Sequence, residues 1–132
     1  EPFLVSSSII GVLAQRLVRR ICPDCRKSYQ PHPEQLRELG IKEVSFRKLD
    51  RRFFRGEGCD NCRQTGYRGR IGIHELLVMS EGVKNTILES SDSDTIKKQG
   101  LKEKMITLRR DGVNKILHGF TTAEEILSIT SE

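Results

Sequence analysis

Four cysteines are the residues of this 132-residue sequence with the clearest capacity for chemistry. They form two C-x2-C pairs separated by thirty-three residues: Cys22, Cys25, Cys59 and Cys62. Two residues between cysteines allow a tight turn to direct both thiolates at one point, and tetrahedral zinc takes four such sulfur ligands. Two pairs leave no coordination position for water. The pattern therefore predicts a structural zinc site and not a catalytic one.

Three other uses of the cysteines stay open from the residues alone. Two disulfides would need an oxidising compartment, and nothing in the sequence indicates export. A thioredoxin-like redox site uses one C-x2-C pair, whereas this sequence has two. Iron takes the same four sulfur ligands. His32, His74 and His118 are secondary candidates as ligands, because four cysteines already complete a tetrahedral set.

Positive charge is concentrated around the cysteines. The formal net charge is +5. Residues 15–70 contain fifteen Lys or Arg against seven Asp or Glu, whereas residues 71–132 contain eight against ten. Four thiolates on one Zn²⁺ would add two negative charges and lower the total to +3. Such a basic half attracts nucleic acid, acidic lipid headgroups or an acidic partner protein.

A basic stretch between the cysteine pairs is where we expect this attraction to act. It contains Arg47, Lys48, Arg51, Arg52 and Arg55, next to Phe53 and Phe54. A basic strand that carries aromatic side chains can stack nucleic-acid bases. Alternatively, the phenylalanines pack beneath the metal site and the charges only keep the surface solvated. We favour an acidic membrane surface or an acidic partner over a specific nucleic acid.

The N-terminal residues predict a strand followed by a helix. Phe3–Val5 is a short apolar run and is expected to be a strand end. Residues 8–20 are expected to form an amphipathic helix, because apolar side chains recur at helical spacing. These side chains are Ile10, Leu13, Leu17 and Ile21.

Beyond the first cysteine pair the patterns predict short elements. Residues 33–39 predict a helix that ends before Gly40, and residues 44–58 read as a basic strand. Residues 70–78 predict a further strand. In residues 80–132, Ser80, the Ser/Asp-rich loop at 90–94 and the Thr121–Glu125 segment supply N-caps for a series of helices. Because these helices carry their own apolar faces, we expect them to be less affected than residues 22–66 by loss of a cysteine.

The sequence has no recognisable catalytic machinery. The phosphate-binding pattern G-x4-G-K-[ST] does not occur, and Gly66, Gly69 and Gly72 bracket a strand where a phosphate loop would precede a helix. No Ser/His/Asp or Cys/His set has the spacing of a nucleophile and its base. We therefore assign no catalytic residue and expect no ATPase activity from this chain alone.

Three stretches resemble the late part of one family of motor proteins, the type II secretion ATPases, which are the traffic ATPases of the general secretory pathway. They are EPFLVSSSIIGVLAQRLVRRICPDC at 1–25, CDNCRQTGYRGRIGIHELL at 59–77 and RRDGVNKILHGFTTAEEILSIT at 109–130. The combination of AQRLVR, both cysteine pairs and YRGRIGIHE is specific to this superfamily. Type IV pilus assembly ATPases and DNA-uptake ATPases share much of it.

The resemblance implies an α+β fragment in four parts. Residues 1–21 would be the end of a RecA-like core, contributing a strand and a helix. Residues 22–66 would be an inserted tetracysteine zinc-binding module, and residues 67–79 a strand returning to the core. Residues 80–132 would be a small helical C-terminal subdomain. The absence of an initiating Met also leads us to expect a fragment of a longer protein.

The resemblance further implies the C-terminal region of a hexameric cytoplasmic ATPase, peripheral at the inner membrane of a bacterium, that powers type II protein secretion by pseudopilus assembly. The Walker motifs of that family lie upstream, so ATP and magnesium are expected only in the full-length parent. The expected partners are neighbouring ATPase subunits, the inner-membrane platform and acidic phospholipid, and the fragment alone is expected to be monomeric. A zinc-ribbon module that binds nucleic acid is the alternative from another functional class.

Overall fold

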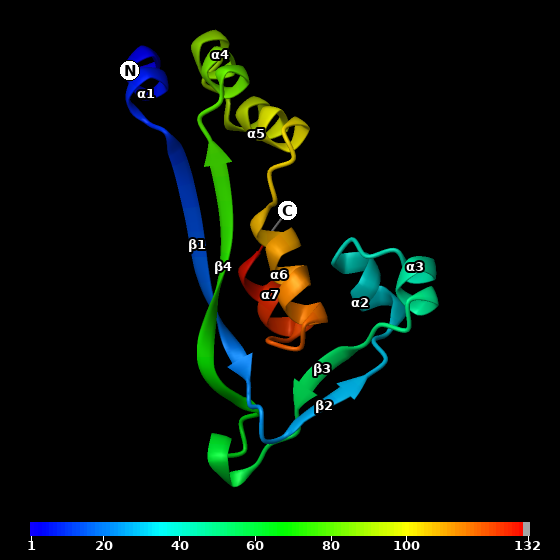
Figure 1. Cartoon of the computed structure of the whole chain (residues 1–132). Coiled ribbons are helices and arrows are strands. Elements are labelled where there is room, and N and C mark those ends of the chain that lie inside the picture. The colour runs from blue at the N-terminus through cyan, green and yellow to red at the C-terminus, as the bar shows by residue number, and fades with distance from the viewer. Residues whose placement is uncertain (131–132) are drawn as a thin grey trace. The chain divides into compact units, whose positions relative to one another are not determined.

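The structure is a computed structural model that describes residues 1–130, and the chain divides into two compact units. Unit 1 comprises Glu1–Gln15 and His74–Thr107, and unit 2 comprises Arg16–Ile73 and the chain from Leu108 onward. Two long strands, β1 (Gly11–Ile21) and β4 (Tyr67–Val78), contribute residues to both units and pair into a two-stranded sheet (Figure 1). The fold is thus α+β, as predicted.

Unit 1 has three helices besides the strand segments. They are α1 (Pro2–Ser8), α4 (Glu81–Glu89) and α5 (Ser93–Lys102). Ser80 caps α4 by accepting from the N–H of Val83 at 3.1 Å, and Asp92 caps α5 by accepting from the N–H of Thr95 at 3.2 Å. Both predicted caps are confirmed. The helices enclose a small core built on Met79, Val83 and Ile87.

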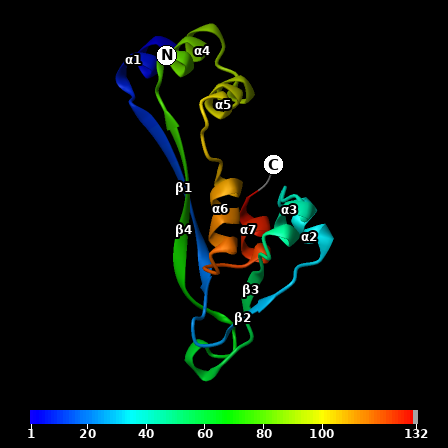
Figure 2. The ribbon, with the colours of Figure 1, turned by 45° about the vertical axis from the view of Figure 1, so that its right-hand side comes forward.

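Unit 2 contains a hairpin, two pairs of short helices and a 3₁₀ turn (Figure 2). These are β2 (Arg26–Tyr29), α2 (Pro33–Glu38), α3 (Glu43–Lys48), β3 (Phe53–Gly56), η1 (Asp60–Cys62), α6 (Leu108–Leu117) and α7 (Ala123–Ile129). Strands β2 and β3 are antiparallel, with Lys27 opposite Arg55 and Tyr29 opposite Phe53. The hairpin therefore carries the helices α2 and α3 between its two strands.

One hydrophobic core unites the elements of unit 2. Its buried members are Val18, Leu36, Leu39, Phe46, Phe53, Ile73, Val113, Ile116, Ala123 and Ile126. Helices α6 and α7 thus share a core with the segment between the cysteine pairs and have no separate one. The helices of residues 80–132 divide between the two units, while the boundaries 1–21, 22–66, 67–79 and 80–132 stay predictions about the parent protein.

The predicted strand and helix at the N-terminus are both wrong. Phe3–Val5 lies within helix α1, and most of residues 8–20 lies in strand β1. Leu13 and Leu17, which suggested a buried helical face, are 60% and 52% exposed. Strand β1 instead pairs with β4, which begins more than forty residues further along the chain. The periodicity of a local segment cannot predict such a distant partner.

Between the cysteine pairs the structure agrees with one prediction and corrects another. Helix α2 forms at 33–38, with Gly40 in the left-handed region at φ 74°. The strand predicted for 44–58 is reduced to β3, because residues 43–48 form helix α3 around the buried Phe46. The predicted strand at 70–78 is confirmed as part of β4. None of the helices in residues 1–130 has the length and apolar character needed to cross a membrane.

Candidate metal centre

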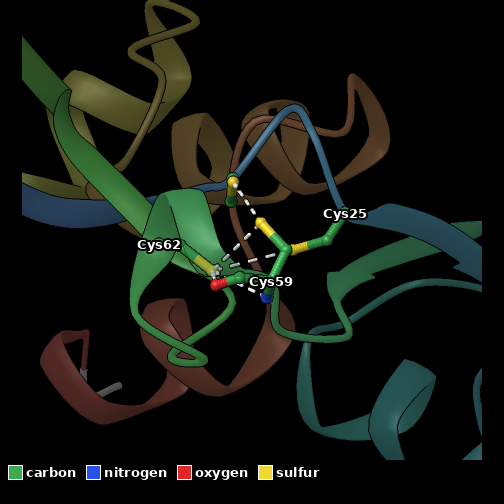
Figure 3. A group of neighbouring side chains, drawn as sticks. Cys25, Cys59 and Cys62 are labelled. Carbon is green, nitrogen blue, oxygen red and sulfur yellow. Dashed lines mark hydrogen bonds between the residues drawn. The ribbon is translucent and has the colours of Figure 1, made fainter.

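The four cysteines lie in two loops of unit 2 that meet. Cys22 and Cys25 occupy the turn between β1 and β2, and Cys59 and Cys62 lie in the loop between β3 and β4. All four sulfur atoms lie within 4.8 Å of one another. Figure 3 shows the side chains of Cys25, Cys59 and Cys62 converging from these loops. The structure therefore brings together all four residues that the sequence selected.

The distances between the sulfurs match a tetrahedral tetrathiolate. The Cys22–Cys59 and Cys25–Cys62 Sγ···Sγ distances are both 3.8 Å, and the Cys59–Cys62 distance is 3.7 Å. Sulfurs at ~2.3 Å from a tetrahedral centre stand about 3.8 Å apart. A disulfide needs about 2.0 Å, and all four cysteines are free. The donor set thus fits zinc, or iron in the same geometry.

Backbone amides surround the sulfurs in the way that stabilises thiolates. The N–H of Gly58 donates to Cys25 Sγ at 3.3 Å. The N–H groups of Cys59 and Gly66 donate to Cys62 Sγ at 3.3 and 3.2 Å. These donors orient the sulfurs and spread their negative charge, which is how an outer shell supports a metal site.

The thiols differ in how readily they ionise. Burial raises the pKa of the Cys25 thiol to about 12, against the hydrogen bond from Gly58 that lowers it. Burial also opposes ionisation of Cys62, but the two backbone N–H groups on its sulfur lower its pKa to about 6. Cys62 therefore ionises more readily than Cys25, and a bound cation would have to displace the proton of the Cys25 thiol.

Comparison with known proteins identifies the family. Residues 1–128 match the family described as type II/IV secretion system protein. The chain belongs to this family. Its relatives include both secretion and pilus ATPases, as the resemblance implied.

Three relatives illustrate the range of this secretion family. The chain is 45% identical to the type IV pilus assembly ATPase PilB of Thermus thermophilus over 132 residues. Over the same length it is 46% identical to the type II secretion system protein E of Aeromonas hydrophila and 39% identical to the type II secretion system ATPase E of Vibrio cholerae. Each alignment covers the whole of this chain, but only 15% of the first relative and 25% of the other two. The chain thus spans a quarter or less of their length.

Two glycines allow the cysteine loops of this secretion-family chain to approach. A Cβ atom on Gly56 would lie 2.1 Å from the carbonyl oxygen of Gly66, and one on Gly66 would lie 2.4 Å from the carbonyl oxygen of Gly56. Gly66 also accepts from the N–H of Cys22 at 3.0 Å. We did not select these residues from the sequence. The signal was a glycine three residues before Cys59 and another four residues after Cys62.

Gly56→Ala is expected to lower the free energy of unfolding by about 1–3 kcal/mol, because the new methyl group meets backbone atoms that cannot rotate away. Urea denaturation of the metal-loaded chain measures this loss. Gly69→Ala is the control: it has a φ of 81° but no atom within 4 Å of the added Cβ, so only backbone strain of about 1 kcal/mol is added. A smaller loss in Gly56→Ala than in Gly69→Ala would contradict this account.

The histidines have other contacts. His32 caps α2, its Nδ1 accepting from the N–H of Glu34 at 3.1 Å. His118 lies just after α6, where its Nδ1 and the carbonyl oxygen of Asn114 are 2.7 Å apart and its ring stacks on Phe120. Among residues 1–130, the group with the geometry to hold a metal consists of the four cysteines.

The turn between α6 and α7 fastens the C-terminal helices to the first cysteine loop. The N–H of Ile21, next to Cys22, donates to the carbonyl oxygen of Phe120 at 2.9 Å. Arg19 donates to both carboxylate oxygens of Glu125 through its backbone N–H and its guanidinium, at 2.6 to 3.1 Å. Arg19 also accepts from the hydroxyl of Thr121 at 2.8 Å. These contacts with the start of helix α7 and the turn before it help to hold the first cysteine loop in place.

Proposed function

We propose that this chain is the C-terminal region of a motor ATPase that drives type II secretion or type IV pilus assembly, and that its four cysteines bind one structural zinc ion. The single observation that carries the zinc assignment is the convergence of four sulfurs within 4.8 Å of one another, three pairs of which are 3.7 to 3.8 Å apart. A closed set of four sulfurs leaves no position for a reacting water, so the metal would hold the fold together and take no part in chemistry.

The parent protein's activity is part of the same proposal. Relatives of both branches are named ATPases or components of secretion and pilus systems. We infer that the parent hydrolyses ATP as a hexamer at the cytoplasmic face of the inner membrane, with a RecA-like core to which residues 1–21 and 67–79 belong. DNA-uptake ATPases remain an alternative branch. Unit 2 would then contact a neighbouring subunit or the membrane platform.

One zinc ion per chain is the expected result of metal analysis on protein purified without added metal. Mass spectrometry under native and denaturing conditions gives the stoichiometry, and elemental analysis distinguishes zinc from iron. The final dialysis buffer, analysed in parallel, controls for adventitious metal. Four free thiols with no bound metal, or two disulfides, would refute the zinc assignment and leave the family membership untouched.

A second role for unit 2, attraction to acidic membrane surfaces, is favoured by one surface of α3. Val44 is 80% exposed and Leu49 is 63% exposed, beside the exposed cations Lys48 and Arg51. Exposed apolar side chains among cations suit the interface of an anionic bilayer, where each nearby cation contributes on the order of 1 kcal/mol. Arg47 is less available, since it pairs with Glu43 at 3.5 Å.

Base stacking by the basic stretch receives less support. Phe53 is completely buried, and Phe54 packs against the backbone of Gly119. Phe53 therefore offers no face to a nucleic-acid base and Phe54 is only partly exposed, so the nucleic-acid alternative loses most of the aromatic surface on which it depended.

A further inference from the structure

Two cations face one another on the β2–β3 hairpin. Lys27 is directly opposite Arg55 in the strand register. Side chains of directly opposed residues lie on the same face of a sheet, where like charges repel. Neither side chain forms an ion pair with a carboxylate of residues 1–130. No ion pair within residues 1–130 neutralises either cation, so an anion bound beside them would relieve the repulsion.

Beside this pair, unit 2 is hollowed by a cavity of about 470 Å³. Its lining includes Tyr29, His32, Gln35, Arg55, Tyr67 and Glu124. The two tyrosines provide flat apolar walls, and the remaining side chains provide hydrogen-bonding groups. A concave site with a few convergent polar groups is the usual form of a binding site.

The guanidinium of Arg55 is oriented by stacking on an aromatic ring, which suits it to bind a planar anion. Its Cζ lies 4.8 Å from the ring centroid of Tyr29, so the ring supports one face. Arg19 lies in the same way over Tyr67, at 4.0 Å, but it is neutralised by Glu125. A stacked guanidinium keeps the N–H groups along its edge, and these match a carboxylate with two parallel hydrogen bonds.

The other walls of the cavity offer both donors and an acceptor. Because Nδ1 of His32 accepts from the N–H of Glu34, the neutral ring carries its proton on Nε2 and can donate through it. Glu124 accepts from Gln35 Nε2 at 3.0 Å and keeps further acceptor capacity. A ligand that fits this lining has a carboxylate near Arg55 and N–H groups near Glu124.

We propose that this cavity binds an acidic segment of a partner protein, with an Asp or Glu side chain held by Arg55 and main-chain N–H groups directed at Glu124. Lys27 lies outside the lining, opposite Arg55 on the hairpin, and adds positive charge beside the cavity. A peptide satisfies both charges of the lining. Free phosphate satisfies only the cations and is repelled by the Glu124 carboxylate. A bilayer cannot enter a concave site, and the protruding side chains of α3 suit it better.

The test is an NMR titration of the full metal-loaded 132-residue chain with acetyl-Gly-Glu-Glu-Gly-amide, and with its Gln-Gln counterpart as the uncharged control. The acidic peptide should shift the amide signals of Tyr29, Arg55 and Thr122, all of which line the cavity, and the Gln-Gln peptide should not. Arg55→Gln should weaken binding about tenfold, since a bidentate contact is lost. Arg52→Gln removes the same charge from an exposed position outside the cavity and should change affinity less than about twofold.

Four outcomes would overturn the proposal. If Arg55→Gln and Arg52→Gln weaken peptide binding equally, the peptide is attracted by the overall positive charge and not by the cavity. Tighter binding of inorganic phosphate at the same signals would mean a phosphate site. The same shifts with phosphatidylglycerol vesicles would mean a membrane surface. No shift at millimolar peptide would mean no site. Lys27→Gln provides a second, independent variant if Arg55→Gln does not fold, and the metal content, measured on each sample, separates this result from the zinc assignment.

Discussion

Removing the metal with a chelator is expected to unfold unit 2 as a whole, including α6 and α7. A metal held by the four sulfurs would join the β1–β2 turn to the β3–β4 loop, and the core of unit 2 is shared by all the segments that these loops connect. A structural zinc site contributes an apparent binding free energy of about 10–16 kcal/mol, which equals or exceeds the whole stability of a typical domain. Hydrogen exchange followed by mass spectrometry should show the loss of protection over residues 16–73 and 108–130.

Unit 1 should respond less to the chelator, since α4 and α5 pack on Met79, Val83 and Ile87 and not on the metal loops. Cys59→Ser should reproduce the chelator's pattern without any chelator present. Asn61→Ala is the matched control in the same loop: it removes one exposed hydrogen bond to Asp24 and should cost only about 1 kcal/mol or less. Protection retained in α7 after complete metal removal would contradict the shared-core account.

This expectation differs from what the sequence suggested. The apolar faces of the C-terminal helices looked sufficient for an independent subdomain. In the structure, Val113, Ile116 and Ile126 pack with Phe46 and Phe53 from between the cysteine pairs. An apolar helical face predicts burial but not the partner, so the sequence could not distinguish a separate core from a shared one.

The cysteines were predictable for a physical reason. Metal ligation requires a short, fixed spacing between the two cysteines of each pair. This spacing can be recognised in the sequence without knowledge of the rest of the fold. The two strands β1 and β4 illustrate the opposite case. Val18 and Ile21 are buried and Leu13 and Leu17 are exposed, an arrangement set by pairing with a distant strand. The local helical spacing of these residues was therefore misleading.

Residues around the metal centre fall between these cases. Gly56 and Gly66 matter because two backbones approach closely, and Arg19 matters because it binds Glu125 more than a hundred positions away. The sequence shows that a residue is glycine, but it does not show which backbone segment that glycine approaches in the fold. The stretches that resemble the family contain Gly66 and Arg19 but not Gly56, and the contacts that give all three residues a role come only from the three-dimensional arrangement.

Phe53→Ala is expected to lower the free energy of unfolding of unit 2 by about 3–5 kcal/mol. The ring is completely buried and makes edge-on contacts with Phe46 and Tyr29, at centroid distances of 5.5 and 6.2 Å. Truncation would leave a cavity between the hairpin and α3 and would remove both aromatic contacts, each worth about 0.5–1.5 kcal/mol beyond its buried area. Thermal and urea unfolding of the metal-loaded chain, followed by circular dichroism, measures the loss.

Phe54→Ala is the matched control, since it removes the same side chain one position along the strand. Phe54 is only partly buried, and its ring packs against Gly119 with the guanidinium of Arg26 at 5.6 Å. Its truncation should cost about 1–2 kcal/mol, from partial burial and one cation–π contact. An equal or larger loss for Phe54→Ala would contradict the assigned core. Weakened DNA binding in Phe53→Ala, with stability unchanged, would instead mean that the ring is available to bases, as the nucleic-acid alternative requires.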